Sequence, residues 1–192
     1  MDKIGRFMFF NCDKIIIFDL EATCWEGREN AYKFREIISM GACILDVKTL
    51  VISDKFHMIC RPERTEVSDY CTKITGITKE QAENGVEFDF MCKSVMEKFK
   101  SKSFPCAAWG QDSEKLYYDC RNKECKYPFS NEYVNISLLY SVMLGKSYNN
   151  GLERSLAEIG YKFEGDKHDP YWDSYNAARI LKYLMEKSRE TV

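Results

Sequence analysis

The pattern of apolar positions predicts an early, deeply buried strand. Residues 15–18 are three isoleucines followed by a phenylalanine, and a short, mostly β-branched run is typical of a strand buried on both faces. Residues 36–45 form a second, mostly apolar stretch. Residues 51–60 alternate well enough to be its antiparallel partner after a turn. We therefore expect a three-stranded meander that places the first strand inside the sheet.

The remainder of the chain predicts helices around two further short strands. Apolar residues recur at helical spacing in three segments, 88–99, 152–159 and 177–184. Shorter helices are expected at 112–116 and 138–144, short helical turns within 68–84, and strands at 104–109 and 133–136. Residues 119–131 are polar and predict a loop, and residues 145–151 predict a flexible connector. Strands followed by surrounding helices indicate an α/β layered domain.

The length of 192 residues predicts a single domain over residues 13–188, with an N-terminal extension at 1–12 and a C-terminal tail at 189–192. Hydrophobic residues make up 45% and charged residues 30% of the chain, which excludes a disordered protein. Apolar runs are far shorter than the ~20 residues that span a bilayer. The apolar patch near the N-terminus lacks the features of a secretory signal. We expect an intracellular, cytoplasmic protein without a membrane partner.

Nine cysteines are scattered singly along the chain, and none forms a Cys-x-x-Cys pair. Reduced thiols in an intracellular protein are the favoured state. A zinc site at Cys120 and Cys125 is conceivable, but the chain has only two histidines, His57 and His168, to complete it. The spacing alone therefore does not predict zinc.

The formal net charge of −2 argues against a protein that coats a nucleic-acid duplex. It leaves open an enzyme that holds a few nucleotides at a metal site, because the metal ions supply local positive charge.

Two acidic side chains follow the buried run at positions 19 and 21. Side chains alternate along a strand, so Asp19 and Glu21 share one face and lie roughly 7 Å apart along it. Two carboxylates at the end of a buried strand repel each other and lose hydration. A hard cation such as Mg²⁺ or Mn²⁺ between them relieves both costs. The alternative is that both residues begin a solvated loop.

Three further residues are candidates for the same site. Asp112 follows Trp-Gly-Gln at a predicted strand end and opens a helix, and Asp173 begins the last helix on its buried face. His168 precedes Asp173 by five residues. Taken singly each is weak, because an aspartate at a helix start is most often an N-cap and a loop histidine is most often solvated.

Taken together, Asp-x-Glu at 19–21, Trp-Gly-x-Asp at 109–112 and His-x-x-x-x-Asp at 168–173 resemble the DEDDh 3′–5′ exonucleases of the ribonuclease H-like fold, over residues 14–187. The segments 18–24, 36–38, 68–78 and 163–165 are similar to the subgroup of the 3′ histone-mRNA exonuclease and KapD-like proteins. The resemblance implies an α/β fold with a central mixed five-stranded sheet flanked by helices.

The resemblance also implies a set of site residues. The metal ligands would be four acids that hold two Mg²⁺ or Mn²⁺ ions per active site: Asp19, Glu21, Asp112 and Asp173. His168 would accept the proton of the attacking water, and two cations are suited to hydrolysing a phosphodiester. Many relatives have two residues between Trp-Gly and the aspartate, where this chain has only Gln111. Glu114 and Asp119 therefore stay open as alternatives to Asp112.

Substrate-binding candidates lie beside these acids. Tyr70 matches an aromatic position that stacks on the terminal base, although it could equally pack within the protein. Thr23 and Cys24 could approach the terminal sugar through backbone groups. Trp109 is either a core residue or a ligand, and Arg35 with Glu36 could form a local ion pair.

The sequence thus predicts a metal-dependent exonuclease that removes nucleotides from single-stranded 3′ ends, RNA being favoured, and releases 5′-mononucleotides. One alternative is a DNA-directed 3′–5′ exonuclease, and another is a catalytically degenerate domain that binds nucleic acid. The sequence predicts no oligomeric state.

Overall fold

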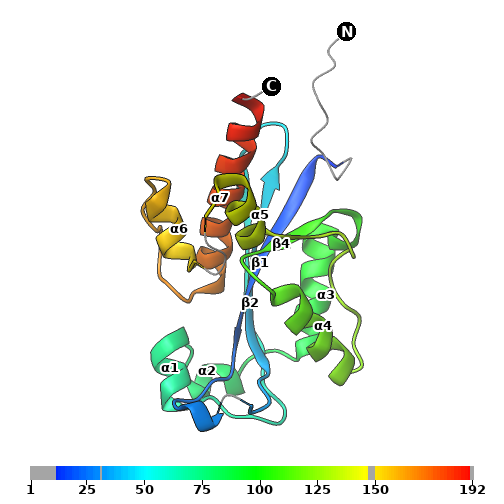
Figure 1. The fold of residues 1–192 in the computed structure, drawn as a ribbon. Helices are drawn as coiled ribbons and strands as arrows, with labels where there is room; N and C mark the ends of the chain where they lie inside the picture. The colour runs from blue at the N-terminus through cyan, green and yellow to red at the C-terminus, as the bar shows by residue number, and fades with distance from the viewer. Residues whose placement is uncertain (1–11, 31, 147–149, 191–192) are drawn as a thin grey trace.

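The computed structural model describes residues 12–30, 32–146 and 150–190, and at its centre is a mixed sheet in the order β3-β2-β1-β4-β5 (Figure 1). The strands are β1 (Lys14–Ala22), β2 (Ile37–Asp46), β3 (Ile52–Ile59), β4 (Cys106–Ala108) and β5 (Tyr133–Asn135). Strands β1, β2 and β3 form an antiparallel meander, and β4 and β5 continue the sheet parallel to β1. The predicted mixed five-stranded sheet is confirmed.

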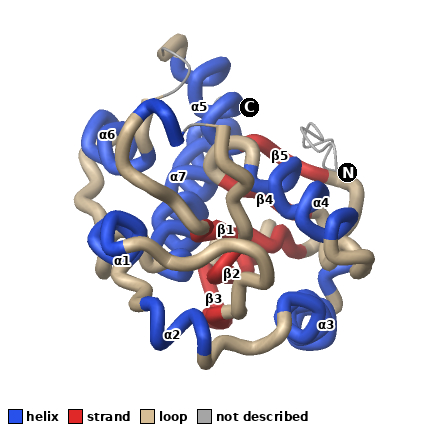
Figure 2. Tube along the Cα trace, turned by 90° about the horizontal axis from the view of Figure 1, so that it is seen from below, coloured by secondary structure: helices blue, strands red, loops and turns tan. Residues whose placement is uncertain are grey.

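Two helical layers cover the sheet (Figures 1 and 2). The helices are α1 (Asp69–Thr75), α2 (Lys79–Glu83), α3 (Phe88–Phe99), α4 (Asp112–Asn122), α5 (Ile136–Leu144), α6 (Leu152–Glu158) and α7 (Pro170–Glu190), with short 3₁₀ turns at Arg28–Asn30 and Ser101–Ser103. Helices α3 and α4 pack on one face, and α5, α6 and α7 pack on the other. Helices α1 and α2 pack near one end of the sheet, around Ile38.

Strand β1 is central because both of its faces are apolar. Ile16 and Phe18 enter the core beneath α3 and α4, whereas Ile15 and Ile17 enter the core beneath α7. Asp19 continues the second of these two faces, since side chains alternate along a strand. The apolar pattern of β1 therefore directs the first acidic residue toward α7.

Several predicted boundaries change in the structure. The loop predicted from residue 119 is wrong for its first four residues, because α4 continues to Asn122 and buries Asp119 and Cys120. Helix α7 begins at Pro170, where a proline is favoured at the first helical position. It extends to Glu190, into the segment expected to be a tail. Residues 1–11, 147–149 and 191–192, which include parts of the predicted extension, connector and tail, lie outside the described residues.

No helix in the described part of the chain has the length and apolar character needed to cross a membrane.

Candidate active site

The first two acids stand at fixed positions in the β1–β2 pair. Asp19 lies opposite Gly41, and Glu21 lies opposite Ser39. Both strands are buried over most of their length, so the two carboxylates project from a rigid part of the sheet. They face the start of α7, as the alternation of β1 predicts.

The first turn of α7 and the loop before it bring Asp173 and His168 to the same place. One ligand atom each from Glu21, His168 and Asp173 lie within 4.8 Å of one another. His168 Nδ1 is 3.9 Å from Glu21 Oε1. The backbone of His168 is in the left-handed region at φ 63°, just before Asp169, whose Oδ1 accepts the Tyr171 N–H at 2.9 Å and so caps α7.

The third acidic contribution comes from the first residue of α4, Asp112. Burial raises the pKa of Asp19 most, and among the neighbouring charges that of Asp112 raises it most. The alternatives lie elsewhere: Glu114 is exposed, and Asp119 is buried and accepts the Ile37 N–H at 2.8 Å. The structure thus brings Asp112 to the cluster and uses Asp119 to tie α4 to β2.

The four carboxylates strongly disfavour one another's ionisation. Burial raises the pKa of Asp19 well above its usual range, and the charges of the other three acids raise it further. Burial and Asp173 raise the pKa of Glu21 to about 8. Burial raises the pKa of Asp112 to about 6 and that of Asp173 to about 6. A cluster of oxygen donors that cannot all ionise at neutral pH without a counter-charge fits hard divalent cations.

One basic residue of the site escaped the sequence reasoning. Lys115 lies one turn after Asp112 on α4, and its charge lowers the pKa values of Asp19, Glu21 and Asp112. Its spacing of three residues from Asp112 is the signal that places both on one helix face. A single ammonium group offsets only part of the charge of four carboxylates.

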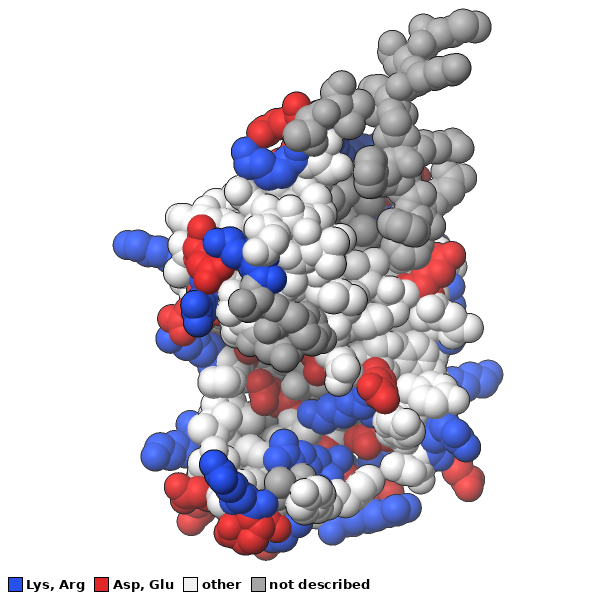
Figure 3. Space-filling model, in the orientation of Figure 1, with Lys and Arg blue, Asp and Glu red and all other residues white. Residues whose placement is uncertain are grey.

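A cleft of about 450 Å³ adjoins Asp112. Its lining includes two cations, Arg35 and Lys115, and two aromatic residues, Phe34 and Tyr118, which are 42% and 55% exposed. In Figure 3, Asp and Glu side chains are recessed in a hollow across the middle of the molecule, and Lys and Arg side chains lie along its lower side. A recessed acidic cluster bordered by cations and exposed rings can hold both metal ions and a phosphate-bearing chain.

Thr23 and Cys24, which were expected to contact the terminal sugar, form several hydrogen bonds within the protein. Thr23 is fully buried, and its hydroxyl accepts the Glu36 N–H at 3.0 Å and lies 3.1 Å from the Thr65 hydroxyl. Its own N–H donates to the Glu36 carbonyl. The Cys24 carbonyl accepts the Ser68 hydroxyl at 2.7 Å. These bonds fix the backbone directly after β1.

The two aromatic candidates lie in different settings. Tyr70 is partly buried in the first turn of α1. Trp109 packs against the core beneath α7, with its ring 5.9 Å from that of Tyr140. Trp109 is therefore partly buried against this core, directly after β4.

Glu36 is not paired with Arg35, so that expectation was wrong. It is fully buried, and its carboxylate accepts hydrogen bonds from Lys123 at 2.7 Å and from the N–H groups of residues 63–65. Burial alone would raise its pKa, but these donors together lower the pKa of Glu36 to about 2. The result is a buried anchor between β2, α4 and the segment after β3.

Comparison with known proteins agrees with this geometry. The sequence profile of the exonuclease family RNase_T matches residues 16–181. This chain belongs to the RNase_T exonuclease family. Human 3′-5′ exoribonuclease 1 is 31% identical over 210 residues, which cover 99% of this chain and 57% of that protein. The Drosophila melanogaster 3′-5′ exonuclease Snipper is 26% identical over 87% of this chain and 67% of its own length. The chain spans about half the length of the first of these relatives.

The similarity extends to solved structures of the family. The nuclease domain of 3′hExo, a DEDDh family member bound to rAMP, superimposes with a TM-score of 0.84 at 32% identity, covering 93% of this chain and 94% of that one. Escherichia coli Exonuclease I, bound to a dT13 oligonucleotide, shares the fold alone, with a TM-score of 0.68 at 14% identity. The resemblance to the DEDDh exonucleases predicted from the motifs is confirmed, and this family depends on divalent metal ions.

Proposed function

We propose that this chain is a metal-dependent 3′–5′ exoribonuclease that removes nucleotides one at a time from a single-stranded 3′ end and releases 5′-mononucleotides. One observation carries the proposal: acids from β1, α4 and α7 converge beside a histidine. The match of residues 16–181 to an exonuclease family supports the proposal. A degenerate domain would be expected to lack one of these groups.

Asp19, Glu21, Asp112 and Asp173 are our candidates to hold two Mg²⁺ or Mn²⁺ ions. Their raised pKa values support this assignment, since two divalent cations would balance four carboxylates. When bound, such ions would lower the pKa of an attacking water and offset the charge that develops on the leaving 3′ oxygen.

His168 is our candidate for the proton acceptor. Its side chain is 54% exposed, so it can meet both water and substrate, and its Nδ1 lies 3.9 Å from Glu21 Oε1 in the carboxylate cluster. Asp169 supports this position. One of its oxygens caps α7 and the other lies 3.7 Å from His57 Nδ1, so the loop that carries His168 is tied to β3.

The cleft beside Asp112 is our candidate path for the RNA chain. Arg35 and Lys115 would contact phosphates, and Phe34 and Tyr118 would stack on bases, which tolerates any sequence. Tyr70, Thr23 and Cys24 remain our proposal for the terminal nucleotide, with Trp109 supporting β4 beneath it. The names of the curated relatives, exoribonucleases in human and mouse, favour RNA over DNA. Free thiols are typical of proteins in the reducing interior of the cell, and within it we propose a cytoplasmic location.

Degradation of matched oligonucleotides tests the proposal. We would incubate 5′-labelled single-stranded RNA and DNA of one sequence with the protein in Mg²⁺, Mn²⁺ or EDTA, beside Asp19→Asn and His168→Ala. Stepwise shortening of RNA that EDTA and both substitutions abolish, with 5′-mononucleotides as products, is the expected result. Asp112→Asn is tested beside them and should also abolish shortening, whereas its control Glu114→Gln should keep activity. Binding without shortening would indicate a degenerate domain. Degradation of RNA and DNA at equal rates would contradict the preference for RNA.

A further inference from the structure

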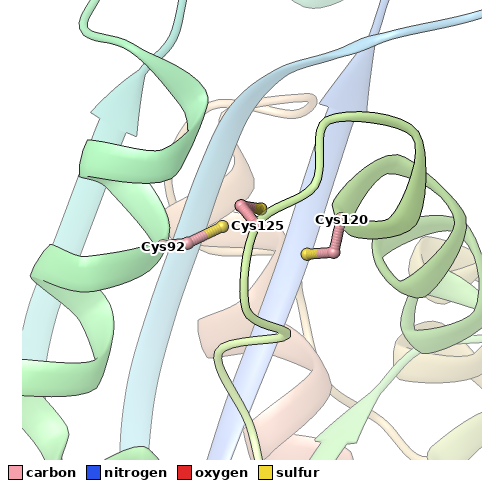
Figure 4. A group of neighbouring side chains, drawn as sticks. All are labelled: Cys92, Cys120 and Cys125. Atoms are coloured by element: carbon pink, nitrogen blue, oxygen red, sulfur yellow. The ribbon is translucent and has the colours of Figure 1, made fainter.

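Three cysteines from two separate segments of the chain converge on the face of the sheet opposite α7. Cys92 lies on α3, Cys120 lies in the last turns of α4, and Cys125 follows α4. Their sulfur atoms all lie within 4.8 Å of one another. Figure 4 shows the three side chains directed into the space between the two helices. Cys92 is thus the third candidate ligand, which the sequence alone did not place beside Cys120 and Cys125.

The separation of the sulfur atoms suits a shared metal ion. Zinc–sulfur bonds of about 2.3 Å in a tetrahedron place neighbouring sulfurs about 3.8 Å apart. A disulfide would use two of the three thiols at about 2.05 Å and leave the third buried beside it. Three convergent thiols also match the soft ligands that Zn²⁺ accepts in structural sites.

The three thiols differ in their exposure to solvent. Cys92 and Cys120 are buried, whereas Cys125 is only partly buried. Water can therefore reach the cluster at Cys125 and complete a tetrahedral set.

We propose that Cys92, Cys120 and Cys125 bind one Zn²⁺ ion through three thiolates, with water as the fourth ligand. Binding releases the three thiol protons to solvent, which leaves a complex of net charge −1 beside Lys123. The ion joins α3, α4 and the segment after α4. Cys120 lies two turns beyond Asp112, roughly 12 Å along the helix axis, so the ion stabilises the helix that presents Asp112.

This site is distinct from the carboxylate cluster in its chemistry. Asp19 and its neighbours offer hard oxygen atoms, whereas the three cysteines offer only soft sulfur atoms. The inference therefore does not rest on the exonuclease proposal, and sulfur-specific measurements separate the two sites.

Cobalt substitution tests the site directly. Protein purified under reductant and stripped of metal is titrated with Co²⁺ and then with Zn²⁺. We expect one equivalent of Co²⁺ with a thiolate-to-cobalt charge-transfer absorption, displaced by one equivalent of Zn²⁺, and a higher Tm with Zn²⁺. Cys125→Ser lowers the absorption and weakens Zn²⁺ binding by more than about 100-fold. This loss exceeds the roughly 10–100-fold that is typical when a residue outside the ligand set is changed. Cys12→Ser, which removes another partly buried thiol, keeps both.

The titration of the unaltered protein decides the matter even if a variant folds poorly. No charge-transfer absorption and no retained Zn²⁺ in the reduced wild-type protein would overturn the proposal. Equal loss of Zn²⁺ binding in Cys12→Ser and Cys125→Ser would overturn it as well. A disulfide between two of the three cysteines in protein loaded with Zn²⁺ would have the same consequence.

Discussion

Gly41 lies in direct contact with the start of α7 at Pro170. A Cβ atom added to Gly41 would fall 2.0 Å from the Pro170 carbonyl carbon, so only a residue without a side chain fits there. Gly41 is also the residue opposite Asp19 in the β1–β2 pair. The missing side chain therefore sets how closely the helix that carries Asp173 approaches the strand that carries Asp19.

Replacing Gly41 by alanine tests this close approach. Gly41→Ala should push the start of α7 from the sheet and lower kcat by about 100-fold, since misplacement by about 1 Å has such effects. Overpacking should also destabilise the fold by about 1–3 kcal/mol. Gly151→Ala is the control, because an added Cβ there meets nothing within 4 Å. Activity measurements and urea denaturation check both effects, and a fully active Gly41→Ala protein would contradict the prediction.

The raised pKa of Glu21 predicts how stability depends on pH without metal. Glu21 titrates at about 8 in the folded protein because of burial and Asp173, but near its ordinary value when unfolded. As pH rises between these values, the unfolded chain is ionised while the folded one is not, so folding loses stability. Glu21→Gln should therefore raise Tm by about 5 °C or more at pH 8 and by much less at pH 5.

Thermal unfolding in EDTA at the two pH values measures this effect. Adding Mn²⁺ should raise the Tm of the unaltered protein more at pH 8 than at pH 5. The rise in Tm should be smaller for Glu21→Gln. A Glu21→Gln protein that is less stable than the unaltered protein at pH 8 in EDTA would show that the carboxylates do not repel one another.

The buried pair of Glu36 and Lys123 predicts a large loss of stability. Lys123→Met leaves the Glu36 carboxylate with its N–H and hydroxyl donors but without a counter-charge, and should cost about 3 kcal/mol. Lys48→Met is the control, because Lys48 and its partner Asp13 are both exposed and should contribute nothing measurable. Urea denaturation at pH 7 compares the two, and equal stabilities would contradict the burial of this charge pair.

Tyr118 tests the cleft as the path of the RNA. Tyr118→Ala should raise KM for a single-stranded RNA by about tenfold with little change in kcat, since base stacking contributes ~1–3 kcal/mol. Tyr117→Ala is the matched control, because Tyr117 is a similarly exposed neighbour on α4 that does not line this cleft. Steady-state kinetics on both variants decides between them. Identical KM values for Tyr118→Ala and Tyr117→Ala would indicate that the RNA does not pass through this cleft.

The spacing of apolar residues along the chain predicted the elements whose apolar faces are continuous in the sequence. The apolar run of β1 and its alternation indicated that Asp19 and Glu21 share one face, and the spacing of apolar residues gave the full extent of α3, Phe88–Phe99. The end of α4, residues 117–122, was missed because the segment is mostly polar and its Asp119 is buried only through tertiary contacts, such as the bond from the Ile37 N–H. Cys92 could not be joined to Cys120 and Cys125 for the same reason, since the three meet only when α3 and α4 pack on the sheet.

A crystal structure of the protein soaked in Mn²⁺, with anomalous scattering used to locate the ions, tests the metal site most directly. We expect two ions about 3.5–4 Å apart, held by carboxylate oxygens of Asp19, Glu21, Asp112 and Asp173 and close to His168. Manganese bound elsewhere, with these four side chains free of any ion, would contradict this expectation.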